Sequence, residues 1–210
     1  MLKPASLQRL RAFRAGQRGF NLIELLVVIA ILGILMAAGL PLVTDGIRDS
    51  RMRSAGESII SGLRVAQSEA LKRNTTVRFQ LTSALDSTCA ISASGTSWVV
   101  STENATGKCD VTDLETSPMP IRREGGAVSG DVTVLADGSG SFCFNGIGRP
   151  TTTPPGCNGT LAEVIDIKSS SITCKAEGGD GRCLRVTVSA AGTIRMCDPA
   201  VGDTKDPRIC

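Results

Sequence analysis

The fold is decided by the stretch Arg18-Gly19-Phe20-Asn21-Leu22-Ile23-Glu24-Leu25-Leu26, which joins a basic segment to a long apolar run. The run extends over residues 20–43 and has polar interruptions at Asn21 and Glu24. An ordinary secretory signal is cut after its apolar region, at a small residue. Here the junction between a small residue, Gly19, and a bulky one, Phe20, lies before the apolar run. A cut at this junction leaves the run at the start of the mature chain. The alternative is a plain membrane anchor in which the glycine is incidental.

Residues 1–19 form a basic leader. They contain five basic residues and no acidic one, which gives this segment a charge of +5. Positive charge before an apolar span is typical of the cytoplasmic side of a membrane, so the rest of the chain is expected outside the cytoplasm. The whole chain carries +3, so removal of the leader's +5 leaves −2. The mature chain is not globally basic, and any nucleic-acid site would have to be a local patch.

Residues 20–43 are expected to form the membrane-spanning half of a long helix. They would make a helix of about 36 Å, which is enough to cross the apolar core of a bilayer. Pro41 permits a bend, because proline removes one helix hydrogen bond. Glu24 is costly in lipid and normally has a partner. A cut after Gly19 provides one, the free amine of Phe20, unless the carboxylate lies shallow enough to stay hydrated.

The second half of the helix, residues 44–74, is expected to be amphipathic. Six apolar residues recur at steps of three and four, which places them on one helical face. This face should cover a sheet, whereas the charged residues form a solvated or subunit-facing surface. Asn74 is the expected end of the helix. The apolar stripe consists of Met52, Ala55, Ile59, Leu63, Ala66 and Ala70.

Residues 75–210 are expected to form a small antiparallel β domain. The apolar period changes to two in Val77-Arg78-Phe79-Gln80-Leu81, whose three apolar side chains should point inward. The fold class is therefore α+β, with a long N-terminal helix packed on a disulfide-bonded antiparallel domain. The other expected strands are residues 97–101, 131–135, 141–144, 162–168, 184–188 and 193–196.

All eight cysteines lie between Cys89 and Cys210, in the part expected outside the cytoplasm. An even number there indicates disulfides. The alternative, a zinc site, is disfavoured because the chain has no C-x-x-C pair and no histidine. Many pairings are possible, and joining sequence neighbours closes the smallest loops. The pairs expected on this basis are Cys89–Cys109, Cys143–Cys157, Cys174–Cys183 and Cys197–Cys210.

The absence of histidine also weighs against an enzyme. No Ser-His, Cys-His or histidine–metal arrangement is available, and the serines and threonines have no evident base partner. We therefore expect no catalytic residue, no cofactor and no metal.

The N-terminal stretch resembles the class III leader and first residues of type IV pilins and type II secretion pseudopilins. The resemblance implies that the prepilin peptidase cuts after Gly19 and N-methylates Phe20. It also implies that Glu24 pairs with the N-terminal amine of a neighbouring subunit during assembly. Two later segments resemble the FimT/GspH group within this superfamily. They are residues 66–74 (AQSEALKRN) followed by Val77, and residues 142–150 (FCFNGIGRP).

The resemblance implies a type IV pilin-like fold and the function of a minor pilin of the FimT type. Such a protein would lie in the bacterial inner membrane as a single-pass precursor with a periplasmic C-terminal domain, and would then enter the pilus at the cell surface. Its partners would be other minor and major pilins, the prepilin peptidase and the inner-membrane assembly platform. The alternative is a GspH-like minor pseudopilin of a type II secretion system.

The last expected hairpin places two arginines on its outer face. A three-residue loop, Ser189-Ala190-Ala191, would keep the apolar side chains of both strands on one face. This register would set Arg185 opposite Arg195, an unfavourable pair of like charges that a phosphate or a carboxylate would relieve.

Some FimT-type pilins are thought to bind DNA through a C-terminal G-R-x-R motif. Here residues 192–195 (GTIR) keep the glycine and the second arginine, with Thr193 in place of the first. A DNA site would use Arg185, Arg195 and Arg208. The alternative is that these arginines are solvated or paired with acids, because phosphate contacts dominate nonspecific affinity and the acidic tail supplies few.

Overall fold

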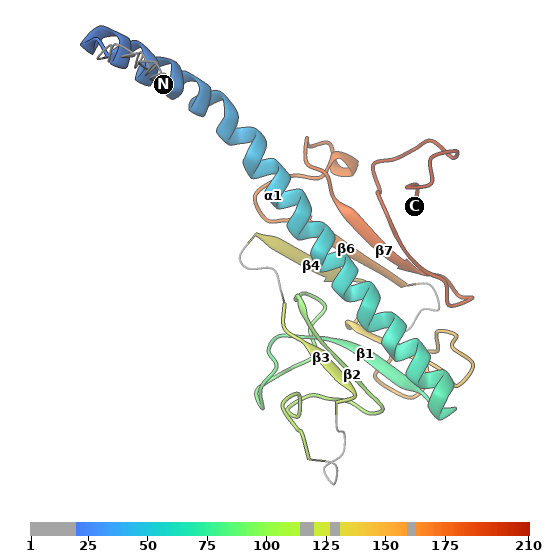
Figure 1. The fold of residues 1–210 in the computed structure, drawn as a ribbon. Helices are drawn as coiled ribbons and strands as arrows, with labels where there is room; N and C mark the ends of the chain where they lie inside the picture. Colours follow the sequence, from blue (N-terminus) through green and yellow to red (C-terminus); the bar gives the residue numbers. More distant parts are fainter. Residues whose placement is uncertain (1–19, 114–119, 127–130, 159–162) are drawn as a thin grey trace, which may run out of the picture. The chain divides into compact units, whose positions relative to one another are not determined.

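The structure is a computed structural model that describes residues 20–113, 120–126, 131–158 and 163–210, without the side chains of residues 37–43. The expected leader, residues 1–19, lies outside the described residues. Over the described part, a long helix is followed by strands and one short 3-10 helix (Figure 1). The elements are α1 (Leu22–Arg73), β1 (Val77–Thr82), β2 (Ser97–Ser101), β3 (Arg122–Glu124), β4 (Val132–Ala136), β5 (Ser141–Phe144), β6 (Glu163–Ser169), η1 (Lys175–Glu177), β7 (Leu184–Val188) and β8 (Ile194–Cys197).

The chain divides into two compact units, Met1–Val43 and Thr44–Cys210. We call them the N-terminal unit and the folded unit. The apolar core begins at Met52 and draws all its members from the folded unit. The folded unit therefore has the closed core that a domain needs to fold by itself.

Within the folded unit, α1 buries the predicted apolar stripe, whose six members are at most 4% exposed. Two glycines allow a close approach to the strands. A Cβ atom on Gly62 would lie 2.5 Å from the ring of Phe79, and one on Gly56 would lie 2.7 Å from the sulfur of Met196. The helix ends where predicted, because Asn74 adopts a φ of 49°, a left-handed conformation that terminates helices.

The strands form two four-stranded sheets, ordered β3-β2-β1-β5 and β4-β6-β7-β8, and every pairing is antiparallel. Side chains of α1 and of both sheets share one core. The bounds of β2, β5 and β7 are those predicted, β1 extends one residue further, and β4, β6 and β8 are each displaced by one residue toward the C-terminus. The sequence did not predict β3, because two of its three residues are exposed arginines without apolar periodicity.

The strand β1 departs from the predicted alternation because both of its faces are buried. On the outer face, Gln80 accepts a hydrogen bond from the backbone nitrogen of Ala105 at 3.0 Å and donates to the hydroxyl of Ser141 at 3.3 Å. Next to it, Arg78 donates to the carbonyl oxygen of Pro155 at 3.2 Å. Loops distant in sequence cover this face, so the local pattern of residues could not reveal its burial.

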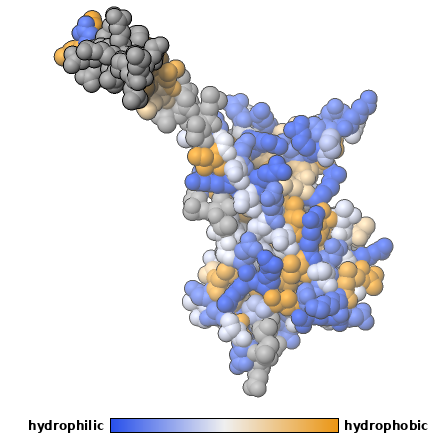
Figure 2. Space-filling model, in the orientation of Figure 1, coloured by the Kyte–Doolittle hydropathy of each residue, from blue (hydrophilic) through white to orange (hydrophobic). Residues whose placement is uncertain are grey.

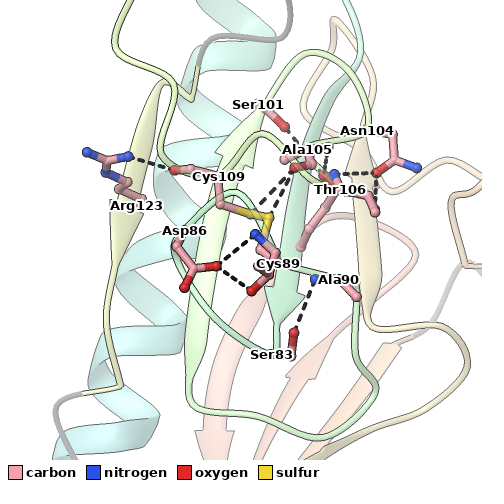
Figure 3. Close-up of a disulfide and its surroundings, with 12 residues drawn as sticks. Ser83, Asp86, Cys89, Ala90, Ser101, Asn104, Ala105, Thr106, Cys109 and Arg123 are labelled. Atoms are coloured by element: carbon pink, nitrogen blue, oxygen red, sulfur yellow. Dashed lines mark hydrogen bonds between the residues drawn. A yellow bond between two sulfur atoms is a disulfide. The ribbon is translucent and has the colours of Figure 1, made fainter.

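The eight cysteines form four disulfides, and the pairs are the four suggested by sequence order: Cys89–Cys109, Cys143–Cys157, Cys174–Cys183 and Cys197–Cys210. Figure 3 shows the first of them, which closes the loop that carries Ala105. The guanidinium of Arg123, on β3, donates to the carbonyl oxygen of Cys109 at 2.7 Å (Figure 3). This disulfide loop is thus fastened to the sheet that it covers.

Gln67 of α1 links turns that belong to different sheets. Its amide nitrogen donates to the carbonyl oxygens of Gly148 and Gly192, each at 2.8 Å. Gly148 lies in the turn after β5, and Gly192 lies in the turn between β7 and β8. The segments 66–74 and 142–150, which were singled out in the sequence, therefore meet at one point of the fold.

The turn between β7 and β8 is longer than predicted, and the predicted register is wrong. Val188 lies opposite Ile194, so the loop is residues 189–193. Gly192, which has a φ of 86°, donates its backbone N–H to the carbonyl oxygen of Ser189. The turn thus holds two more residues than the predicted three-residue loop. The apolar side chains stay on one face, but Arg185 lies opposite Cys197 and Arg195 lies opposite Thr187.

Candidate functional site

The start of the N-terminal unit carries the residues expected to be processed. Gly19 lies outside the described residues, and Phe20 is the first described one, with 79% of its surface exposed. The carbonyl oxygen of Asn21 accepts hydrogen bonds from the backbone nitrogens of Glu24 at 3.0 Å and Leu25 at 3.2 Å. Glu24 therefore lies in the first turn of α1 and is exposed. An amine on Phe20 would lie about one helical turn from this carboxylate.

Apolar side chains surround the first turns of α1. The large apolar residues from Leu22 to Met36 are 48–79% exposed. In the part of the chain that the structure describes, no helix has both the length and the apolar character needed to cross a membrane. The side chains of residues 37–43, which complete the expected span, lie outside the description. An exposed apolar surface of this extent is typical of a segment that contacts lipid or other proteins.

Arg185, one of the three arginines considered for DNA binding, has a carboxylate partner. Its Nε donates to Asp166 Oδ1 at 2.7 Å and its Nη2 donates to Asp166 Oδ2 at 3.1 Å. The two residues lie opposite each other on β7 and β6. The hydrogen bonds from Asp166 raise the pKa of Arg185 above its ordinary value. Sequence reasoning missed this pair because the carboxylate lies on the preceding strand, beyond the hairpin under consideration.

The other two arginines also have acceptors. Arg195 donates from Nη2 to the backbone oxygen of Ile209 and, at 3.1 Å, to that of Cys210. Arg208 pairs with Asp206, with an Nη2–Oδ2 distance of 2.6 Å. This hydrogen bond lowers the pKa of Asp206 to about 2.

The structure thus gives Arg185, Arg195 and Arg208 separate partners. A DNA phosphate bound at any of them would have to compete with an acceptor that the side chain already contacts. The geometry therefore agrees with the alternative in which these arginines already have acceptors, and DNA binding stays a prediction.

A cleft that the sequence did not reveal lies near the start of the folded unit. Its volume is about 630 Å³, and it separates the first turns of α1 in this unit from the segment 172–182, which contains η1. Polar and charged residues, in blue, cover much of the visible surface of the folded unit in Figure 2. The lining includes Asp45, Arg48, Asp49, Ile172, Asp180 and Arg182.

Ion pairs satisfy only part of the charge in this cleft. Arg48 contacts Asp45 at 2.9 Å, and Arg182 contacts Asp198 at 3.2 Å. The carboxylates of Asp49 and Asp180 make no hydrogen bond or ion pair with another described residue. Throughout the described ranges, no group of three or more histidine, cysteine or acidic side chains is arranged to hold a metal ion.

Two family models match the sequence. The model described as "Type II transport protein GspH" matches residues 55–192, which is more than half of the chain. The model described as "Prokaryotic N-terminal methylation motif" matches residues 14–40, which include the Gly19–Phe20 junction and Glu24.

Individual relatives are similar over shorter or more divergent regions. A "Type II secretion system protein H" from Xanthomonas campestris pv. campestris is 43% identical over 69 residues, which are 31% of this chain and 39% of the relative. Crystal structures of the Pseudomonas aeruginosa type IV minor pilin FimU match in two crystal forms. Their TM-scores are 0.47 and 0.44, with 19% and 18% identity, and they cover 71% and 69% of this chain and 90% of FimU.

Proposed function

Because the chain is a type IV pilin-like protein that belongs to the GspH family, we propose that it is a minor pilin that helps to assemble a type IV pilus. It acts in this proposal as a structural subunit and not as an enzyme. Its partners are other minor and major pilins, together with the assembly platform of the inner membrane. The precursor is anchored in that membrane by residues 20–43, and the folded unit faces the periplasm before it reaches the cell surface.

One observation carries the proposal: the folded unit closes its core without the apolar helix that precedes it. All core members lie at or beyond Met52, whereas the large apolar side chains from Leu22 to Met36 stay exposed. A helix that is apolar on all sides is stable only when something covers it. Lipid in the precursor and neighbouring subunits in a fibre meet this need in turn.

The methylation motif matched at residues 14–40 supports the processing steps of this proposal. The prepilin peptidase cuts after Gly19 and methylates the new amine of Phe20. Glu24 then pairs with the N-terminal amine of a neighbouring subunit, which compensates the cost of a carboxylate in an apolar surrounding. The position of Glu24 in the first turn of α1 supports this role, because the side chain and the terminus lie at the same end of the helix.

A minor pseudopilin of a type II secretion system is the second candidate. The observation in its favour is the 43% identity over 69 residues to a protein named for that system. The same processing and the same role of Glu24 apply to both candidates, so the N-terminal region does not discriminate between them.

The test is a deletion strain complemented with the full chain. We expect sheared surface pili to be lost on deletion and restored by the wild-type gene and by Ser87→Ala, a control at an exposed loop position. Secreted proteins are measured in the same cultures. Normal pili with defective secretion would replace the first candidate by the second, and normal results in both assays would refute the proposal.

A further inference from the structure

The C-terminal end of α1 carries an exposed pair of apolar residues. Leu71 is 53% exposed, and Ile147, in the turn after β5, is 68% exposed. The turn brings them together, because a Cβ atom on Gly148 would lie 3.3 Å from the side chain of Leu71. Among the described residues of the folded unit, the other exposed large apolar ones are Ile47 and Leu135. Exposed apolar residues that gather in one place are typical of a binding surface.

Hydrogen bonds hold the turn that carries Ile147 in one conformation. The side-chain oxygen of Asn145 accepts hydrogen bonds from the backbone nitrogens of Ile147 at 3.2 Å and Arg149 at 3.0 Å. The backbone nitrogen of Asn145 donates to the carbonyl oxygen of Arg149 at 2.9 Å. Gln67 of α1 donates to the carbonyl oxygen of Gly148 at 2.8 Å. Such a rigid turn has little conformational freedom to lose on binding, which favours the binding of a partner.

Three segments meet at this end of the folded unit, and we call their exposed surface the end face. They are residues 69–75, 145–149 and 189–193. Gly148 contacts the first segment at Leu71, and a Cβ atom on Gly192 would lie 2.6 Å from its carbonyl oxygen. The three segments contain three basic residues and one acidic residue, a net charge of +2. A surface with this excess of one sign selects a partner of negative charge.

The one acidic residue of the end face is already shared. Glu69 pairs with Lys72 at 3.4 Å and with Arg73 at 2.8 Å. The side chain of Arg149 is exposed and makes no hydrogen bond or ion pair with another described residue. A carboxylate of a partner would therefore give Arg149 a charge-assisted hydrogen bond that it lacks within its own chain.

The residues of the end face favour a protein over a nucleic acid as the partner. Surfaces that bind DNA depend on many phosphate contacts and are largely polar. Here two large apolar side chains, Leu71 and Ile147, are exposed together with Ala190 and Ala191 of the third segment. The cores of protein–protein interfaces combine apolar side chains with arginine, as Arg149 would here.

We propose that the end face binds a pilin-like subunit different from this chain. An apolar side chain of that subunit covers Leu71 and Ile147, and a carboxylate beside it pairs with Arg149. The inference rests on the proposed function, in which this chain is a minor subunit whose neighbours are other pilins. It adds the surface that contacts such a neighbour and the acidic, apolar chemistry that the neighbour presents.

The test places a photo-crosslinking amino acid at Ile147 of the full chain, expressed in its own cells. We expect a crosslinked product with a different pilin-like subunit, whose linked peptide contains Asp or Glu. Arg149→Glu should reduce the yield about tenfold, because like charges then face each other at the contact. Replacing the acidic residue of the linked peptide by arginine should restore the yield.

Matched controls come from other surfaces of the same unit. The crosslinking amino acid at Leu135, an exposed apolar residue of β4, should not give this product. Arg122→Glu, at an exposed arginine of β3, should leave the yield from Ile147 unchanged. A thiol assay shows whether each variant folds, because all eight cysteines are paired in the native structure.

Three products would overturn the inference: a dimer of this chain, a crosslink to nucleic acid, or a subunit adduct whose yield is insensitive to the charge changes. Absence of any product would overturn it as well. Surface pili and secreted proteins are measured in the same strains and in the deletion strain. No product in cells whose pili depend on this gene rejects the contact and leaves the proposed function standing. The expected product in cells whose pili and secretion do not depend on the gene does the reverse.

Discussion

Gly148 and Gly192 lie so close that a Cβ atom on Gly192 would be 2.6 Å from the carbonyl oxygen of Gly148. Both glycines have positive φ, 75° and 86°, a conformation that other residues adopt at a cost. Both carbonyl oxygens accept from the one amide nitrogen of Gln67. Three segments distant in sequence thus depend on a single side chain for two hydrogen bonds.

The first prediction concerns this amide. Gln67→Glu keeps the shape of the side chain but replaces the donor by an acceptor, which then faces two carbonyl oxygens. We expect the unfolding free energy to fall by about 1–3 kcal/mol. Denaturant unfolding of residues 44–210 measures it, and Ser68→Ala, at the exposed neighbouring position, serves as the control. Equal stability of Gln67→Glu and the wild type would show that the two turns hold together without this donor.

The second prediction compares two glycines of α1. A Cβ atom on Gly62 would lie 2.5 Å from the ring of Phe79 and 3.0 Å from that of Trp98, whereas one on Gly46 would meet nothing within 4 Å. Gly62→Ala should therefore destabilise the folded unit by about 1–3 kcal/mol, because the core is overpacked. Gly46→Ala should be neutral or stabilising by up to about 1 kcal/mol, since alanine is the better helix former. Thermal unfolding measures the stability of both variants. A similar loss of stability in both would contradict the close packing around Gly62.

The third prediction is a dependence of stability on pH. Glu163 is 4% exposed, and its Oε2 accepts from Asn158 at 2.7 Å. Burial raises the pKa of Glu163 above its ordinary value of 4.5, and the charge of Asp137 adds to the rise. The folded state thus holds this proton more firmly than the unfolded chain does, so the contribution of Glu163 to stability is fully present below pH 4.5 and is lost as pH rises through the raised pKa.

Glu163→Gln keeps an acceptor for Asn158 and removes the charge. We expect this variant to be more stable than the wild type at pH 7 and to lose the decline above pH 4.5. Asp206→Asn is the contrasting control. The pKa of Asp206 is lowered to about 2, so its contribution is present at neutral pH and disappears as pH falls toward that value. Unfolding curves at several pH values measure how the stability of each variant changes with pH. A change in the opposite direction for either residue would contradict the prediction.

The fourth prediction concerns the tail. The disulfide between Cys197 and Cys210 spans 13 residues, and replacing both cysteines by serine should lower the unfolding free energy by about 3 kcal/mol, the value expected for a loop of this length. Arg195 should then lose its contacts with Ile209 and Cys210. Hydrogen exchange is the measurement, and faster exchange confined to the tail and β8 is the expected result. Unchanged exchange there would mean that the tail stays in place without the disulfide.

The fifth prediction separates processing from assembly. Glu24→Ala leaves the Gly19–Phe20 junction intact, so the leader should be removed as in the wild type. Incorporation into fibres should fail, because the carboxylate proposed to pair with a neighbour's amine is absent. Gel mobility reports the first step, and the amount of protein in the sheared fibre fraction reports the second. Normal incorporation would remove the assembly role from Glu24.

Sequence patterns predicted the elements that follow a simple period. Helical spacing predicts the stripe from Met52 to Ala70, and the residue type of Asn74 predicts the end of α1; both predictions are confirmed. The strands other than β3 were predicted, and each of their bounds differs from the prediction by no more than one residue. The disulfide pairs followed from their order along the chain, because short loops are the easiest to close.

The remaining features depend on contacts between distant segments. The burial of Arg78 and Gln80 requires loops from beyond β2 and β5, and the partner of Arg185 is Asp166 on a different strand. The wrong register between β7 and β8 has the same origin. The loop length was predicted from the residues of the hairpin alone, whereas Gly192 is held in the turn by a hydrogen bond from Gln67 of α1. The cleft beside η1 lies between segments that share no pattern.

The order of the disulfides has a consequence for biogenesis. The eight cysteines pair in sequence order, the first with the second, the third with the fourth and so on, with separations of 20, 14, 9 and 13 residues. If the part of the chain after residue 43 crosses the membrane in sequence order, an oxidase that joins each newly emerged thiol to an earlier one that is still free produces this set of bonds. No crossed bond then has to be corrected by an isomerase, so we expect a cell that can only oxidise thiols to mature this protein.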